Sequence, residues 1–141
     1  MAKLNLILSL ILISAHTSAF SSTDLEKKLQ EKCLSTFDII EKQNLQALIK
    51  LMPSKPSADE LSHTKKYLEK KHNKWFIKGG AIKEKHKKNI TYQTPSKTLV
   101  EMFGASKIMK TKISVLSKNF ETDTSCSFMK INNNWYLHRL P

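Results

Sequence analysis

Three consecutive asparagines near the carboxyl end constrain the fold more than any other feature of this sequence. Asn132, Asn133 and Asn134 separate two stretches rich in β-branched, aromatic and aliphatic residues, within the segment from Thr124 to Leu140. Asparagine tolerates a positive φ, so an asparagine cluster between two such stretches is typical of a β-hairpin turn. We therefore predict a hairpin that closes a β-sheet.

Alternation along both stretches predicts that one face of this hairpin is apolar. Cys126 and Phe128 share one face of the first strand, and Trp135 and Leu137 share one face of the second. An apolar sheet face has to pack against other elements. The amino-terminal half of the chain offers helices that can cover it.

The first 19 residues have the pattern of a cleavable secretory signal peptide. Lys3 gives a positive start, Leu4 to Ile13 form an apolar run, and residues 17–19 approximate a cleavage site. The apolar run falls well short of the roughly 20 residues that span a bilayer. We predict export to the periplasm or the extracellular medium, a single domain over residues 20–141, and no transmembrane segment after cleavage.

Apolar residues at four-residue spacing predict a first helix after the leader. The stripe on this helix consists of Leu25, Leu29, Cys33 and Phe37. Thr23 with Glu26 has the pattern of a capping box at the start of the helix. This helix would place Cys33 on the side that faces the sheet.

Two further helical segments are predicted before the sheet begins. Residues 45–52 form a short amphipathic stretch that ends at Pro53. Ser57 and Glu60 repeat the capping-box pattern, and the helix that they open extends towards the glycine pair at residues 79–80.

After the glycine pair the apolar period changes towards two, which indicates strands. Before the hairpin we predict extended segments over residues 82–93, 98–103 and 108–117. Helices followed by strands, without alternation of the two, favour an α+β fold with an antiparallel sheet.

Two motifs in this order resemble a known family. Residues 79–83 read Gly-Gly-Ala-Ile-Lys, and residues 128–137 combine an apolar-lysine run, the asparagine turn and a strand that begins with tryptophan. The chain is similar, from about Asp24 to Leu140, to the nuclear-transport-factor-2-like (cystatin-like) superfamily. Within it, the chain resembles a domain-of-unknown-function group of small exported bacterial proteins and lipoproteins.

The resemblance implies amino-terminal helices packed on a curved antiparallel sheet, a cone or roll with a cavity between the two layers. It carries no catalytic residue onto any position of this sequence. The chain departs from the lipoproteins of the group because no cysteine follows its apolar leader. This difference points to an exported form without a lipid anchor.

The sequence contains two cysteines, Cys33 and Cys126. In an oxidising compartment they are candidates for one disulfide, which would close a loop of 93 residues. Such a closure stabilises a fold by about 4.5 kcal/mol, less any strain. Two separate buried thiols, which behave as small hydrophobes, remain the alternative.

Positive charge is the property that stands out most. The chain has 24 Lys and Arg residues against 12 acidic ones, and much of the excess lies between residues 65 and 88. The candidate anion-binding residues in this window are Lys65, Lys66, Lys70, Lys71, Lys74, Lys78, Lys83, Lys85, Lys87 and Lys88. They could attract anionic partners. The alternative interpretation is that these lysines form a solvated helix face and protect an edge strand against pairing with another chain.

Few residues offer chemistry for catalysis. Glu101, on the predicted strand at residues 98–103, and His138 are the candidates for a cavity site, and no histidine pair has metal-ligand spacing. We predict no catalytic residue, no metal and no cofactor. The basic window contains no arginine, so sequence-specific readout of nucleic acid is not expected.

Taken together, the sequence predicts a small, exported, non-enzymatic binding or accessory domain. Its basic surface would contact anionic envelope components or another exported protein. One alternative is a cavity enzyme or small-ligand carrier with Glu101 or His138 at its site. Another is a module that only pairs with a protein partner. Binding through lysines should weaken steeply with salt, whereas binding in an apolar cavity should not.

Overall fold

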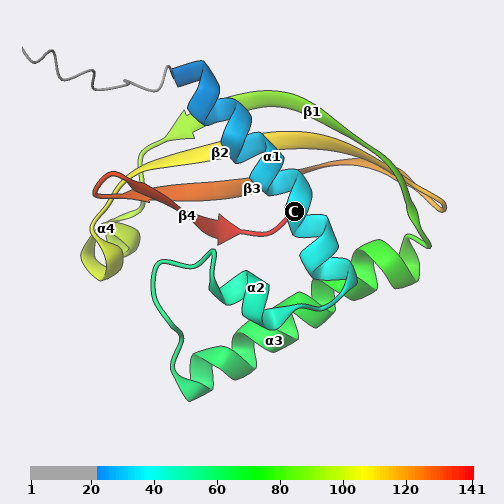
Figure 1. Cartoon of the computed structure of the whole chain (residues 1–141), viewed down its shortest axis with the longest axis horizontal. Helices are drawn as coiled ribbons and strands as arrows, with labels where there is room; N and C mark the ends of the chain where they lie inside the picture. Colours follow the sequence, from blue (N-terminus) through cyan, green and yellow to red (C-terminus); the bar gives the residue numbers. More distant parts are fainter. Residues whose placement is uncertain (1–21) are drawn as a thin grey trace, which may run out of the picture.

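The computed structural model describes residues 22–141, so the predicted signal peptide lies outside the described residues. The helices of the described part are α1 (Ser22–Glu41), α2 (Leu45–Ile49), α3 (Ala58–His72), the π-helix η1 (Asn73–Lys78) and α4 (Lys97–Phe103) (Figure 1). The strands are β1 (Ile82–Gln93), β2 (Ala105–Ser117), β3 (Glu121–Ile131) and β4 (Asn134–Arg139).

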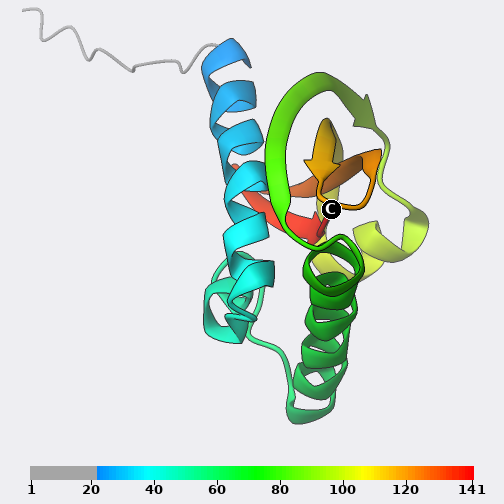
Figure 2. The same ribbon diagram turned by 90° about the vertical axis from the view of Figure 1, so that its right-hand side faces the viewer.

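The four strands form one antiparallel sheet in the order β1-β2-β3-β4, so each strand pairs with its neighbour in sequence. The strands curve strongly, and Figure 2 shows α1 and α4 on opposite sides of them. The predicted α+β class, with helices packed on a curved antiparallel sheet, is confirmed.

The core lies between α1, α3 and η1 on one side and the sheet on the other. The sheet face that meets the helices carries Met109, Thr111, Ile113, Val115, Cys126 and Phe128, all buried, and we call it the helix-covered face. The helices contribute Leu29, Phe37, Ile40, Leu68 and Trp75, which are also buried. These side chains fill the space between the two layers, where the family resemblance implied a cavity.

The predicted apolar stripe and hairpin are both confirmed. Leu29 and Phe37 of the stripe are 2% and 1% exposed. β3 and β4 pair across a turn in which Asn132 adopts a φ of 53°. Leu137 joins the core, and the partly buried Trp135 packs against it. β3 begins at Glu121, so the predicted connection before the hairpin is shorter than expected.

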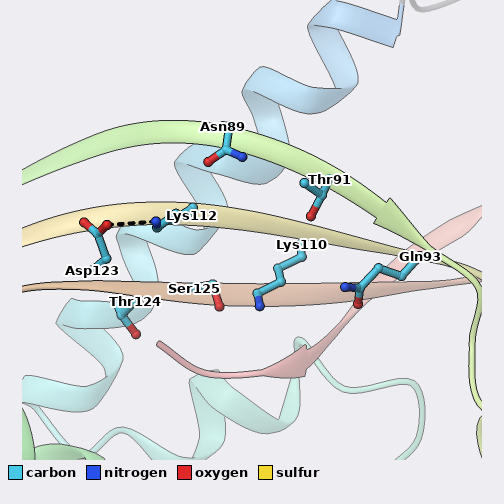
Figure 3. A pocket seen from close by; sticks show the side chains of 8 residues that line it. All are labelled: Asn89, Thr91, Gln93, Lys110, Lys112, Asp123, Thr124 and Ser125. Atoms are coloured by element: carbon cyan, nitrogen blue, oxygen red, sulfur yellow. Dashed lines mark ion pairs between the residues drawn. The ribbon is translucent and has the colours of Figure 1, made fainter.

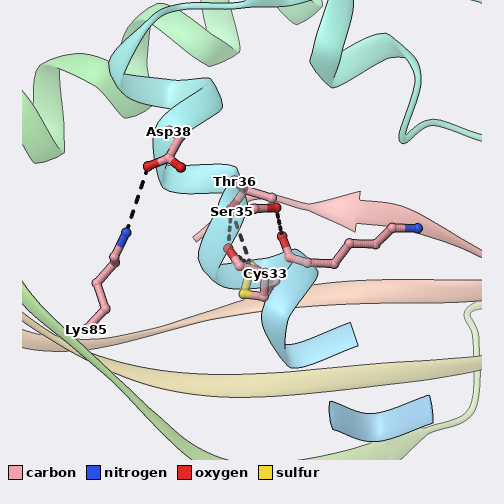
Figure 4. A network of polar contacts seen from close by, with 7 residues as sticks. Cys33, Ser35, Thr36, Asp38 and Lys85 are labelled. Carbon is pink, nitrogen blue, oxygen red and sulfur yellow. Dashed lines mark hydrogen bonds and ion pairs between the residues drawn. A yellow bond between two sulfur atoms is a disulfide. The ribbon is translucent and has the colours of Figure 1, made fainter. Parts of the chain in front are cut away.

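Cys33 and Cys126 form a disulfide across the core (Figure 4). Their Cα atoms are 5.8 Å apart, and both residues are fully buried. The hydroxyl of Thr36 donates to the carbonyl oxygen of Cys33 at 2.6 Å, next to the bridge. Of the two alternatives left open by the sequence, the structure therefore has the disulfide.

Capping explains where α3 begins. The amide of Ser57 donates to Glu60 Oε2 at 2.8 Å, and Ser57 Oγ accepts from the Glu60 amide at 3.4 Å, which confirms the predicted capping box. Hydrogen bonds to its carboxylate from the backbone amide of Ser57, and secondly from the Ser57 side chain, lower the pKa of Glu60. The helix α1 begins earlier than its predicted cap at Thr23, since it already includes Ser22.

The predicted strand at residues 98–103 is wrong, because this segment is the helix α4. Local capping decides the conformation. Ser96 Oγ accepts from the amide of Leu99 at 3.4 Å, and Gly104 ends the helix with a φ of 66°. Short apolar runs are ambiguous between strand and helix, and here the two caps favour the helix.

Candidate functional site

The ten lysines predicted to bind anions lie on two elements. Six of them, Lys65, Lys66, Lys70, Lys71, Lys74 and Lys78, belong to the continuous helix formed by α3 and η1. We call these six the α3–η1 lysine surface. The other four, Lys83, Lys85, Lys87 and Lys88, lie on β1.

The β1 lysines are largely neutralised by acidic partners. Lys85 and Lys87 pair with Val115 and Ile113 of the helix-covered face, so their side chains project towards α1. The ion pairs are Lys85 with Asp38 at 4.0 Å (Figure 4), Lys87 with Glu31, and Lys88 with Asp123 at 2.8 Å. These ion pairs connect β1 to α1 and to β3.

The α3–η1 lysine surface differs, because within residues 22–141 none of its six lysines forms an ion pair. Lys66, Lys70 and Lys74 follow one another at four-residue spacing and therefore share one side of the helix. Leu68 and Trp75 are buried on the side that faces the core. The charges of the exposed Lys65, Lys66, Lys70 and Lys78 are therefore available to a partner.

Lys71 lies at the inner margin of this surface and is half-buried. Its Nζ donates to the carbonyl oxygen of Leu140 at 3.2 Å and lies 5.4 Å from the ring centre of Tyr67. Its pKa is lowered to about 8, first by burial and then by the like charges of Lys74, Arg139 and Lys70. Burial also lowers the pKa of Lys74. Burial, aided at Lys71 by neighbouring positive charges, thus disfavours the charged form of these two lysines.

An exposed aliphatic side chain interrupts the lysines. Ile77, in η1 between Lys74 and Lys78, is 64% exposed. The sequence analysis did not single it out. The available signal was that Ile77 lies two residues beyond Trp75 and so falls outside the stripe that faces the core.

A separate hollow of about 330 Å³ lies between the residue 52–56 loop, the start of α3, α4 and the sheet. Its apolar lining includes Met52, Leu99, Phe103 and Met129, and His63 and His138 also line it. His138, one of the two predicted cavity residues, is thus found at a hollow outside the core. Burial and the charge of Arg139 lower the pKa of His138.

Glu101, the other predicted cavity residue, is not at this hollow. It lies on the exposed surface of α4, where it pairs with Lys97 at 3.6 Å. Its expected position depended on the strand that the structure replaces with a helix. The described residues also contain no group of three or more His, Cys, Asp or Glu side chains placed to bind a metal ion.

No protein-family model matches the chain, and no curated protein matches it. Function has to be inferred from the surfaces themselves. None of the helices in residues 22–141 combines the length and apolarity needed to cross a lipid bilayer. The α3–η1 lysine surface has the most concentrated unpaired charge among the predicted site residues, and it is the candidate site.

Proposed function

We propose that the protein is an exported, non-enzymatic binding domain whose α3–η1 lysine surface rests on an anionic membrane surface of the cell envelope. One observation carries this proposal. Six lysines without an ion pair in the described chain lie on the same continuous helix as Ile77, which is 64% exposed. A helix with lysines and an exposed aliphatic side chain suits the boundary between lipid headgroups and acyl chains.

The energetics favour a lipid surface over a single dissolved anion. Each lysine near an anionic leaflet contributes about 1 kcal/mol, and the contributions of several lysines on one helix face add together. Lys66, Lys70 and Lys78 are exposed and can reach such a surface. Ile77 adds apolar contact that a dissolved anion could not use.

Export and family membership belong to the same proposal. The buried disulfide between Cys33 and Cys126 is typical of proteins that fold in an oxidising compartment. The helices-then-strands order agrees with the nuclear-transport-factor-2-like resemblance of the sequence. Both support an envelope location, where anionic lipid headgroups are available.

Vesicle co-sedimentation tests the proposal. The protein should bind vesicles that contain phosphatidylglycerol and not vesicles of phosphatidylcholine alone, and the binding should weaken between 50 mM and 500 mM salt. The triple variant Lys66→Ala, Lys70→Ala, Lys78→Ala should lower the partition coefficient on the order of 100-fold.

A matched variant controls for net charge. Lys42→Ala, Lys55→Ala and Lys97→Ala remove three exposed lysines from other parts of the chain. This control should keep most of the binding. Equal losses in the two triple variants, or equal binding to both kinds of vesicle, would refute a dedicated surface on α3 and η1.

The hollow at His63 and His138 favours a second candidate function, a carrier for a small amphipathic ligand. Its apolar lining at Leu99, Phe103 and Met129 can hold a hydrocarbon chain, and the two imidazoles can contact a polar head. Titration with decanoic acid, followed by calorimetry, tests it. Binding should be nearly independent of salt and should be lost in Met129→Trp, which fills the hollow.

A further inference from the structure

The sheet face turned away from α1 carries a row of polar side chains that crosses all four strands. Thr91 of β1 pairs with Lys110 of β2, Lys110 pairs with Ser127 of β3, and Ser127 pairs with Arg139 of β4. Residues that are directly opposite in an antiparallel sheet project to the same face. We call these four residues the cross-sheet row and this side the open face.

The open face is hollowed along this row. One hollow of about 350 Å³ lies over β1, β2 and β3, and a second of about 280 Å³ continues from it towards β4 and α4. The two share Gln93, Lys110 and Ser125 in their lining, so they form one groove. Figure 3 shows the polar side chains that line its first part, with α1 behind the strands.

Charge in the groove is unevenly compensated. Asp123, at one end, binds two lysines, Lys88 at 2.8 Å and Lys112 at 2.9 Å. Within residues 22–141, neither Lys110 nor Arg139 forms an ion pair. The groove is therefore positive in its middle and at its β4 end.

The sheet fixes the backbone positions of the two unpaired cations. Two strand spacings separate the Cα atoms of Lys110 and Arg139, a distance of about 10 Å. Ser127 lies between them and is only 8% exposed. Its hydroxyl makes no hydrogen bond to another described residue, so it can contact a ligand in the groove.

We propose that this groove binds an acidic oligosaccharide that carries carboxylate groups. The hydroxyl and amide side chains of its lining can form hydrogen bonds with sugar hydroxyls. The two unpaired cations can bind uronate carboxylates. Leu99 and Ile108 form a small apolar patch near α4 against which a sugar ring can pack its C–H face. The groove shares no lining residue with the α3–η1 lysine surface and does not depend on the proposed membrane contact, although the charge of Arg139 also acts on Lys71.

Two other classes of ligand fit the groove less well. Single-stranded nucleic acid is held largely by bases stacked on aromatic rings, and the residues that line the two parts of the groove include His138 but no Phe, Tyr or Trp. An extended peptide commonly pairs with the free edge of a sheet, whereas the groove lies on its face. A chain of hydroxyl groups and carboxylates remains the best match.

Calorimetric and NMR titrations of the purified protein test the proposal. The probes are a tetramer of galacturonic acid, a neutral tetramer of glucose and inorganic phosphate. We expect the uronate tetramer to bind at least tenfold more tightly than the other two. The backbone amide signals that shift should belong to the groove, including those of Thr91, Ser125 and Ser127.

Variants that each remove one positive charge then locate the binding site. Lys110→Gln and Arg139→Gln change exposed side chains, and each should weaken binding of the uronate tetramer roughly tenfold. Their amide spectra away from the groove verify that they remain folded. The matched control Lys66→Gln with Lys70→Gln, on the α3–η1 lysine surface, should leave this affinity unchanged.

Three results would overturn the groove proposal. They are equal affinity for the uronate and neutral tetramers, signal shifts centred on α3, and loss of affinity only in the Lys66 and Lys70 variant. A protein that binds the uronate tetramer but not anionic vesicles would support the groove while refuting the membrane contact. The two proposals can therefore fail separately.

Discussion

Cys33 in the middle of α1 is bonded to Cys126 in β3, with the two Cα atoms 5.8 Å apart inside the core. The bridge joins residues 93 positions apart in sequence, so it fastens the helical half of the chain to the sheet half. Phe37, one turn further along α1, packs its ring edge-on against Trp75, and the two ring centres are 5.4 Å apart. The disulfide thus joins α1 to the sheet, and the ring contact joins α1 to η1 within the same core.

Removing the disulfide should lower the free energy of unfolding by about 2–5 kcal/mol, because the unfolded chain regains the entropy of an open loop of this length. Cys33→Ala combined with Cys126→Ala provides the variant, and urea denaturation provides the measurement. Reductant should lower the stability of the wild-type protein by a similar amount and leave the variant unchanged. A reductant-insensitive wild type would contradict the prediction.

Asp123 should make the protein sensitive to acid. Hydrogen bonds from Lys88 and Lys112 lower its pKa from 3.8 to about 2. Since this pKa is below that of the unfolded chain, Asp123 stabilises the fold above about pH 4, and the contribution is lost as the pH falls towards 2.

Unfolding measured at pH 5, 4, 3 and 2 checks this prediction. Asp123→Asn should be less stable than the wild type at pH 5 and should approach it at pH 2. Because these groups are exposed, 1 M salt should reduce the difference. A difference that does not change with pH would show that the carboxylate charge of Asp123 is not involved.

Lys71 should produce a pH dependence of the same sign at alkaline pH. Its pKa of about 8 is below the 10.5 of an unperturbed lysine, owing to burial and to Lys74, Arg139 and Lys70. Between these two values the unfolded chain binds more protons at Lys71 than the folded chain does. Stability should therefore rise as the pH increases above 8.

Comparison of the wild type with Lys71→Met at pH 7.5 and pH 9.5 isolates this effect. The rise should be smaller in the variant, which keeps most of the length of the side chain without its charge. The window ends below pH 10 because Tyr67, whose pKa is raised by burial, faces the same amine. An identical rise in both proteins would rule out Lys71 as its source.

Thr111 offers a site for stabilisation. It is fully buried on the helix-covered face, and its Oγ1 has no hydrogen-bond partner among the described residues. Thr111→Val has almost the same shape without the hydroxyl, so it should raise the free energy of unfolding by about 1 kcal/mol. Thr111→Ser, which keeps the hydroxyl and loses the methyl group, should lower it. Chemical denaturation of both variants gives the comparison, and a destabilised valine variant would contradict it.

The elements that the sequence predicted well are those governed by neighbouring residues. The asparagine turn, the capping box at Ser57 and the apolar stripe through Leu29 and Phe37 each depend on spacings of a few positions. Residues 98–103 were predicted wrongly for a related reason. Their apolar pattern fits a strand or a helix, and the caps at Ser96 and Gly104, just outside the run, decide between them.

The candidate sites were less accessible to sequence reasoning. Lys85 and Lys87 look in sequence like members of the same basic surface as Lys66, yet they face α1 and pair with its acidic residues. The cross-sheet row could not be found at all. The pairing of Thr91 with Lys110 depends on the shift in the β1–β2 register between Lys87 and Ile90, and no local sequence pattern predicts this shift.

The sequence by itself determined the α+β class, the hairpin, the apolar faces and the excess of positive charge, since each follows from residue type and short-range spacing. Only the tertiary structure decided that Cys33 meets Cys126, which lysines stay unpaired, and that Lys110 and Arg139 flank Ser127 on one face. Those outcomes depend on the distance between residues far apart in the chain. That distance is set by strand register and by the packing of α1 on the sheet.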